Sequence, residues 1–140
     1  MLDRLDTDLN ARIACRWSQC RRARMPLALL QLDVRNLDDW RDSVGDAAAR
    51  SLLAELGRRL KRRVRDTDEV LTLQEGHYAL LLPGAGAPEA ALVRARLEAA
   101  LAAPYRIGSL LLCPTLTIVE RLWVEEGAAE RAPAPLALAG

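Results

Sequence analysis

Residues 70–83 read VLTLQEGHYALLLP, and this stretch decides the fold. Two short apolar runs, 70–73 and 77–82, flank Gln74-Glu75-Gly76, which places a glycine at the bend. Strand-forming runs separated by a few residues that include Gly predict a β-hairpin. The chain must therefore supply further strands that extend this hairpin and helices that cover it.

Outward from the hairpin, the hydrophobic periodicity predicts one long series of elements. Residues 27–33 (LALLQLD) hardly alternate, which is typical of a strand buried on both faces. Helices are expected over residues 9–24, 38–44, 47–64 and 88–103, and further strands over residues 110–113 and 115–119. This order predicts an α+β sandwich, with helices packed on a mostly antiparallel sheet.

Composition indicates one domain with a real core. The chain has 140 residues, 51% of them hydrophobic, which argues against two domains and against wholesale disorder. Lys and Arg number 20 against 19 Asp and Glu, so overall charge does not favour binding to nucleic acid or to anionic membranes. We expect the domain to span residues 1–124, followed by an Ala/Pro-rich flexible tail over residues 125–140.

The apolar runs and the cysteines exclude other classes of protein. No apolar run approaches the roughly 20 residues that span a bilayer, and the N-terminus does not resemble a signal peptide. We therefore expect a cytoplasmic protein without direct membrane insertion. Cys15, Cys20 and Cys113 form no C-x-x-C pair, so neither a disulfide framework nor a zinc site is indicated.

The order of elements and the local sequence resemble the GGDEF (diguanylate cyclase) family, a ferredoxin-like relative of the nucleotide cyclases. In that family a strand ends in L-D-x-D-x-F-K-x-x-N-D and leads to G-H-x-x-G-D. Residues 32–42 (LDVRNLDDWRD) and 45–50 (GDAAAR) align with these motifs without a gap. The signature R-x-G-G-[DE]-E-F-A-x-x-L-P falls on residues 72–83 (TLQEGHYALLLP). The resemblance extends from about residue 27 to residue 119.

The resemblance implies a cyclase site that this chain no longer completes. Joining two GTP molecules requires divalent metal held by carboxylates, and Asp33 keeps only the first of the two expected. Gly76 stands at the second carboxylate position and has no side chain, while Gln74 and Glu75 place bulk where two glycines admit the nucleotide. His77 replaces a glutamate, and Tyr78 replaces the phenylalanine of the signature.

Guanine recognition is altered as well. Arg41 and Arg50 stand where the resemblance implies an Asn and an Asp that read the base, and arginine offers donors only. The family's later helix, with its phosphate-binding lysine, has no match after residue 119. We therefore expect no cyclase activity, no catalytic residue, no metal ion and no cofactor.

A second motif of the family remains in place. Residues 65–68 (RDTD) match the R-x-x-D site at which cyclic di-GMP binds many family members. An arginine donates to phosphate or to guanine N7 and O6, and a carboxylate accepts from the guanine N1–H and N2–H₂. The resemblance therefore assigns cyclic di-GMP binding to Arg65, Asp68 and Arg96, with Arg94 as a neighbour of Arg96.

Plainer interpretations exist for the same residues. Arg65 and Asp68 could form an exposed ion pair worth less than about 1 kcal/mol. Asp33 could cap the end of its strand, and His77 could simply lie on the hairpin surface. The basic residues Arg58, Arg59, Arg62 and Arg63 are most simply the solvated face of a helix.

Two functions remain open. The first is a catalytically inactive GGDEF domain that acts as a cyclic di-GMP receptor and reports to a protein partner or to a second copy. It would resemble the receptor domains that regulate bacterial exopolysaccharide secretion or biofilm formation, such as that of the Pel system. The alternative is a pseudo-enzyme interaction or dimerisation module that binds no nucleotide.

Overall fold

The predicted hairpin forms one half of a four-stranded antiparallel sheet. A computed structural model describes residues 2–124 of the chain. In it β2 (Glu69–Gln74) pairs with β3 (His77–Pro83), β3 pairs with β1 (Leu27–Val34), and β1 pairs with β6 (Leu116–Trp123). The resulting order β2-β3-β1-β6 places β1 and β3 inside the sheet. The predicted α+β class and its antiparallel sheet are confirmed.

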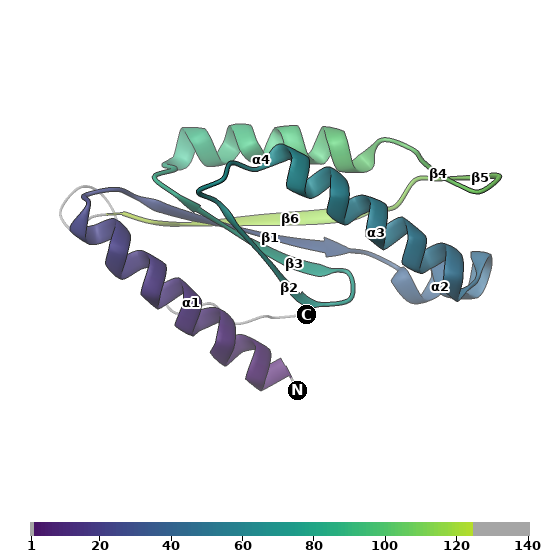
Figure 1. The fold of residues 1–140 in the computed structure, drawn as a ribbon, viewed down its shortest axis with the longest axis horizontal. Coiled ribbons are helices and arrows are strands. Elements are labelled where there is room, and N and C mark those ends of the chain that lie inside the picture. Colours follow the sequence, from purple (N-terminus) through teal and green to yellow (C-terminus); the bar gives the residue numbers. More distant parts are fainter. Residues whose placement is uncertain (1, 125–140) are drawn as a thin grey trace.

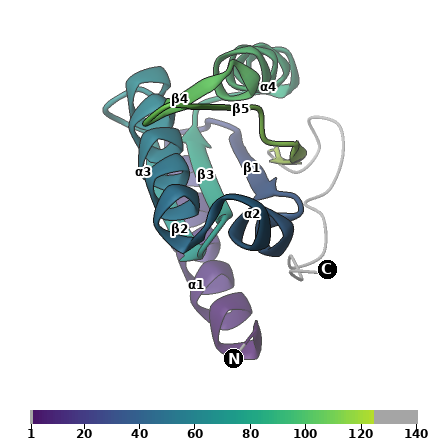
Figure 2. The same cartoon turned by 90° about the vertical axis from the view of Figure 1, so that its right-hand side faces the viewer.

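Helices cover both faces of this sheet (Figure 1). α1 (Leu2–Arg22) crosses one face, while α3 (Asp46–Arg63) and α4 (Ala87–Ala102) lie on the other. The short α2 (Leu37–Val44) follows β1 and lies beside the end of the sheet at which β1 ends (Figure 2). All four predicted helices are present, and α1 begins earlier than the predicted residue 9.

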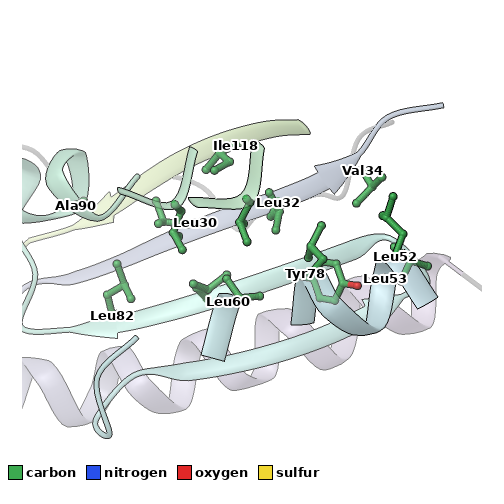
Figure 3. Packing of buried hydrophobic residues seen from close by; sticks show 14 of the residues in the cluster. Leu30, Leu32, Val34, Leu52, Leu53, Leu60, Tyr78, Leu82, Ala90 and Ile118 are labelled. Carbon is green, nitrogen blue, oxygen red and sulfur yellow. The ribbon is translucent and has the colours of Figure 1, made fainter. Parts of the chain in front are cut away.

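The larger hydrophobic core lies between the sheet and the pair α3 and α4. Alternate residues of β1 and β3 point into it and meet the apolar stripe of α3 (Figure 3). The main contributors that are no more than 1% exposed are Ala28, Leu30, Leu32, Leu52, Leu56, Leu60, Leu80, Leu82, Leu97, Leu101 and Tyr105. Burial of each leucine side chain contributes about 1.5–3 kcal/mol, so this layer dominates the stability of the fold.

A smaller core lies under α1 on the opposite face. Leu9, Ile13 and Cys20 of α1 pack against Leu27 and Leu29 of β1, together with residues of β3 and Trp123. Because β1 is covered on both faces, its leucines need not alternate with polar residues, as the sequence predicted. Burial raises the pKa of the Cys20 thiol.

The region after α4 differs from the prediction. The strand predicted over residues 110–113 is present as β5 (Leu110–Leu112). It lies outside the main sheet and pairs with an unpredicted strand, β4 (Tyr105–Ile107), in a separate two-stranded sheet. Gly108, with φ +61°, turns the chain between these strands, and three-residue strands are too short to show a period of two.

Arg59 departs from the solvated face predicted for α3. Its guanidinium donates to the carbonyls of Ala100, Ala103 and Pro104 at 2.8–3.1 Å and lies 3.7 Å from the centre of the Tyr105 ring. Arg59 therefore binds the carbonyl groups that the C-terminus of α4 leaves free. Burial raises the pKa of Tyr105, its neighbour, to about 12.

Two further expectations concern the C-terminal tail and membrane insertion. The predicted tail over residues 125–140 lies outside the described residues. Within residues 2–124, no helix is both long enough and apolar enough to cross a membrane.

Candidate functional site

The β2–β3 turn lies against the end of β1, and its geometry requires glycine at position 76. Gly76 has φ +79°, and its carbonyl accepts a 2.8 Å hydrogen bond from the Val34 N–H. A Cβ atom added to Gly76 would lie 3.1 Å from Cδ2 of Leu37. The position that the family resemblance assigns to a second carboxylate is therefore packed against α2, and a side chain there would be strained by the positive φ and by tight contact with Leu37.

Asp33 and His77 stand opposite each other on β1 and β3 and form a pair. Asp33 Oδ1 lies 2.6 Å from His77 Nδ1, and both side chains are about one-third to two-fifths exposed. The sequence interpretation treated the two residues separately, as a strand-end cap and a surface residue. Their antiparallel register is the signal that could have placed them together, because directly opposed residues have neighbouring Cβ atoms.

Arg41 of α2 is shared among several carboxylates. Its guanidinium pairs with Glu75 of the β2–β3 turn. Its Nη1 lies 3.1 Å from Asp38 Oδ1, and its Nε lies 3.5 Å from Asp46 Oδ1. Arg50, the second arginine expected near the base site, lies 3.7 Å from Asp46. Both arginines therefore face carboxylates of the protein itself. The pairing of Arg41 also ties the hairpin tip to α2.

A hollow of about 400 Å³ remains beside these groups, bordered by Asn36, Asp39, Arg41, Glu75 and His77. Gln74 is exposed, and the β2–β3 register shifts between Thr72 and Gln74. Tyr78 points away from the hollow into the core, where burial, and to a lesser extent Glu75, raise its pKa. Of the groups that line the hollow, Arg41, Glu75 and His77 are already engaged with other side chains of the domain.

The Mg²⁺ ion that the family resemblance implies does not fit these residues. Mg²⁺ is bound through carboxylate oxygens, but Asp33 is hydrogen-bonded to His77, and Gly76 offers no side chain. Glu75 is paired with Arg41. Among residues 2–124, no three His, Cys, Asp or Glu side chains gather closely enough to hold a metal ion.

The R-x-x-D motif forms a closed turn at the start of β2. The Arg65 N–H donates to Asp68 Oδ2 at 2.8 Å, the Asp68 N–H donates to the Arg65 carbonyl at 3.0 Å, and Arg65 Nη2 donates to Asp68 Oδ1 at 2.7 Å. Arg65 Nη2 also donates to the Pro83 carbonyl at 3.0 Å. The hydrogen bond with Asp68 raises the pKa of Arg65.

Exposure differs sharply between the two members of this pair. The Arg65 side chain is 56% exposed, whereas the Asp68 side chain is only 3% exposed, because Arg65 and the turn cover it. In this arrangement Arg65 presents an open face to solvent. Both oxygens of Asp68 are engaged by Arg65, so the carboxylate cannot accept from a ligand until Arg65 moves.

The two arginines of α4 lie on different sides of the helix. Residues two apart are separated by about 200° around an α-helix. Arg94 pairs with Glu98 and lies 3.6 Å from Glu120 of β6, so it points toward the β6 side. Arg96 is exposed, and two positions along the helix it lies on the side away from Arg94.

The comparisons with known proteins agree with this fold. The chain matches the family model described as diguanylate cyclase, GGDEF domain, over residues 7–117. The chain therefore belongs to the GGDEF family. No curated protein matches it.

Solved structures of GGDEF domains have the same fold. The GGDEF domain of TpbB (also called YfiN) from Pseudomonas aeruginosa has a TM-score of 0.77 and 25% identity, covering 84% of this chain and 69% of that one. An EAL/GGDEF domain protein from M. capsulatus has a TM-score of 0.65 and 30% identity, covering 70% and 64%. The GGDEF domain of DgcB from Caulobacter crescentus, solved in complex with c-di-GMP, has a TM-score of 0.70 but only 11% identity, covering 77% and 66%.

Proposed function

We propose that this GGDEF domain does not synthesise cyclic di-GMP and instead binds it at the R-x-x-D turn. The absence of synthesis rests on the residues at the hairpin tip. Asp33 is held by His77, Gly76 has no side chain and is closely packed against Leu37, and Glu75 is paired with Arg41. These contacts leave no carboxylate pair to position a metal-bound triphosphate.

The receptor role rests on one observation, the exposed guanidinium of Arg65 held in place by Asp68. The pairing fixes the guanidinium plane, and its outer face is open for stacking on a guanine or for donation to a phosphate. Arg96, exposed on α4, supplies a second cation for a ligand that carries two phosphates and two guanines. Arg94 is engaged with Glu98 and Glu120 and contributes less.

The lack of synthesis is tested by incubating the purified chain with GTP and Mg²⁺ or Mn²⁺. We expect no cyclic di-GMP by chromatography, under conditions in which an active diguanylate cyclase converts the GTP. Clear production of cyclic di-GMP would show that the proposal about the hairpin tip is wrong.

Binding is tested by calorimetric titration with cyclic di-GMP. We expect a saturable heat in the native chain that is lost in Arg65→Ala. The matched control is Arg58→Ala, because Arg58 is a similarly exposed arginine of α3 that pairs with Glu55. Equal affinity in native protein and Arg65→Ala would remove the site assignment.

A second candidate function, a protein-interaction module that binds no nucleotide, is favoured by the closure of the same turn. Asp68 is 3% exposed and fully engaged, as in a purely structural ion pair. The titration separates the two functions: no heat up to high micromolar cyclic di-GMP would support the interaction module. This domain would then act through its partner or a second copy alone.

A further inference from the structure

The segment that carries the R-x-x-D turn is also joined to α1 by two arginines. The carboxylate of Glu69, the first residue of β2, pairs with Arg12 and lies 3.3 Å from Arg16 Nε. Arg16 Nη2 also donates to the Thr67 carbonyl at 3.2 Å. We call the set Arg12, Arg16, Thr67 and Glu69 the α1 clasp.

The clasp and the R-x-x-D turn share one short piece of backbone. Thr67 lies inside the turn, between Arg65 and Asp68, and Glu69 follows Asp68 directly. The turn is closed by backbone groups as well as side chains, since the Asp68 N–H donates to the Arg65 carbonyl. A movement that opens the turn must therefore displace the Thr67 carbonyl to which Arg16 donates.

Engagement of Asp68 by a ligand requires such a movement. The Asp68 side chain is 3% exposed, and its oxygens accept from the Arg65 main chain and guanidinium. Because Asp68 Oδ2 accepts the Arg65 main-chain N–H, a guanine edge that binds both carboxylate oxygens must break this main-chain closure as well as displace the guanidinium. The closed turn and an occupied Asp68 are thus two different states of the same segment.

The surroundings of Arg16 allow this change. A hollow of about 320 Å³ lies on one side of it, beside Arg12 and Asp68, and another of about 310 Å³ lies on the other, beside Met25 and Pro83. The loop is therefore not locked against α1 by close apolar packing at this point. Arg16 Nε is buried and lies 3.3 Å from Glu69 Oε1, but it makes no hydrogen bond to Glu69 or to any other group within residues 2–124, so the closed clasp is less stable than a fully hydrogen-bonded one.

We propose that the α1 clasp couples the R-x-x-D turn to α1, so that a ligand that engages Asp68 releases the clasp and loosens α1. This inference rests on the proposed receptor function and adds the route by which binding is reported. By linkage, a change that opens the clasp must also make ligand binding more favourable. Ligand binding is then reported to a partner as a change in how firmly α1 packs on the sheet.

The clasp is tested first without ligand, by hydrogen exchange of the 140-residue chain. Glu69→Gln removes the charge that holds Arg12 and Arg16, so we expect exchange to rise about threefold in residues 12–20 and in the loop 65–69 together. The control is Glu98→Gln, which removes a partner of Arg94 on α4 and leaves α1 untouched. If Glu69→Gln proves unstable, Arg16→Lys keeps the charge but replaces the guanidinium that reaches Thr67 and Glu69 through two different nitrogens by a single ammonium nitrogen. Unchanged exchange of α1 in both variants would show that the clasp does not hold the helix.

The coupling is tested next with cyclic di-GMP. In native protein we expect the ligand to raise exchange in residues 12–20, and we expect Glu69→Gln to bind about fivefold more tightly because no clasp has to open. Binding with equal affinity in both and with unchanged α1 exchange would overturn the coupling while the receptor role stands. Absence of binding in both proteins would overturn the receptor role, and the ligand-free comparison alone would then decide the clasp.

Discussion

The tip of the β2–β3 hairpin (residues 74–77) and the R-x-x-D turn lie at opposite ends of β2. In both, the charged side chains form ion pairs within the domain. At the tip, Arg41 is divided among three carboxylates that are all more than half exposed. At the turn, Arg65 meets a single carboxylate that is almost fully covered and also accepts a backbone N–H. Ion pairs weaken with exposure, so the charges stabilise the turn much more than the tip.

The tip depends instead on its backbone. Gly76 combines a positive φ with close packing against Leu37 and Val34, and its carbonyl is bonded to β1. A carboxylate side chain at position 76 would therefore be opposed by steric strain, in addition to any effect of the neighbouring charges. The turn meets no such obstacle, because its opening breaks hydrogen bonds of Asp68 with the Arg65 side chain and main chain and forces no atoms into close contact.

The largest expected effect on stability comes from a substitution of Gly76 at the hairpin tip. Gly76→Ala imposes a left-handed conformation on a side chain whose Cβ would lie 3.1 Å from Leu37, so we expect the free energy of unfolding to fall by about 2–3 kcal/mol. Gly108→Ala is the control, because Gly108 also has positive φ but no atom within 4 Å of the added Cβ. It isolates the backbone cost, about 1 kcal/mol. Equal losses in urea unfolding of the two variants would show that packing against α2 does not enforce the glycine.

The next effect concerns the turn. Asp68→Ala leaves the Arg65 N–H and guanidinium without their acceptor, so we expect a loss of about 1–2 kcal/mol in the free energy of unfolding. Asp66→Ala changes an exposed carboxylate of the same turn and is expected to alter stability by less than about 0.5 kcal/mol. If both variants behave alike in urea unfolding, the contrast between turn and tip disappears.

The sequence predicted more of the fold than of the contacts within the sites. The hairpin, the doubly buried β1 and the four helices follow from patterns that one chain segment carries by itself. The separate β4–β5 pair was missed because three residues carry no periodicity. Arg59 was placed on the solvated face, since helical spacing does not reveal that carbonyls at the end of α4 lie within its reach.

The sites show the same division. The spacing of the motifs located the residues, but the partners come from different elements that only the fold brings together. Asp33 meets His77 across two strands, and Glu69 meets Arg12 and Arg16 from a helix some fifty residues earlier in the sequence. Whether Asp68 is open or covered depends on the rotamer of Arg65 and on the main-chain hydrogen bonds that close the turn, neither of which a sequence pattern specifies.

The smallest expected effect on stability comes from a substitution of Glu75 at the hairpin tip. Glu75→Gly removes the carboxylate that pairs with Arg41 and restores one glycine of the family signature. Glu75 is 59% exposed, and Arg41 retains Asp38 and Asp46 as neighbours, so we expect unfolding in urea to change by no more than about 0.5–1 kcal/mol. Glu75→Gln, which keeps the side-chain volume, separates the loss of charge from the added backbone freedom. A loss as large as that of Asp68→Ala would mean that the Arg41 pair, and not the glycine backbone, holds the tip closed.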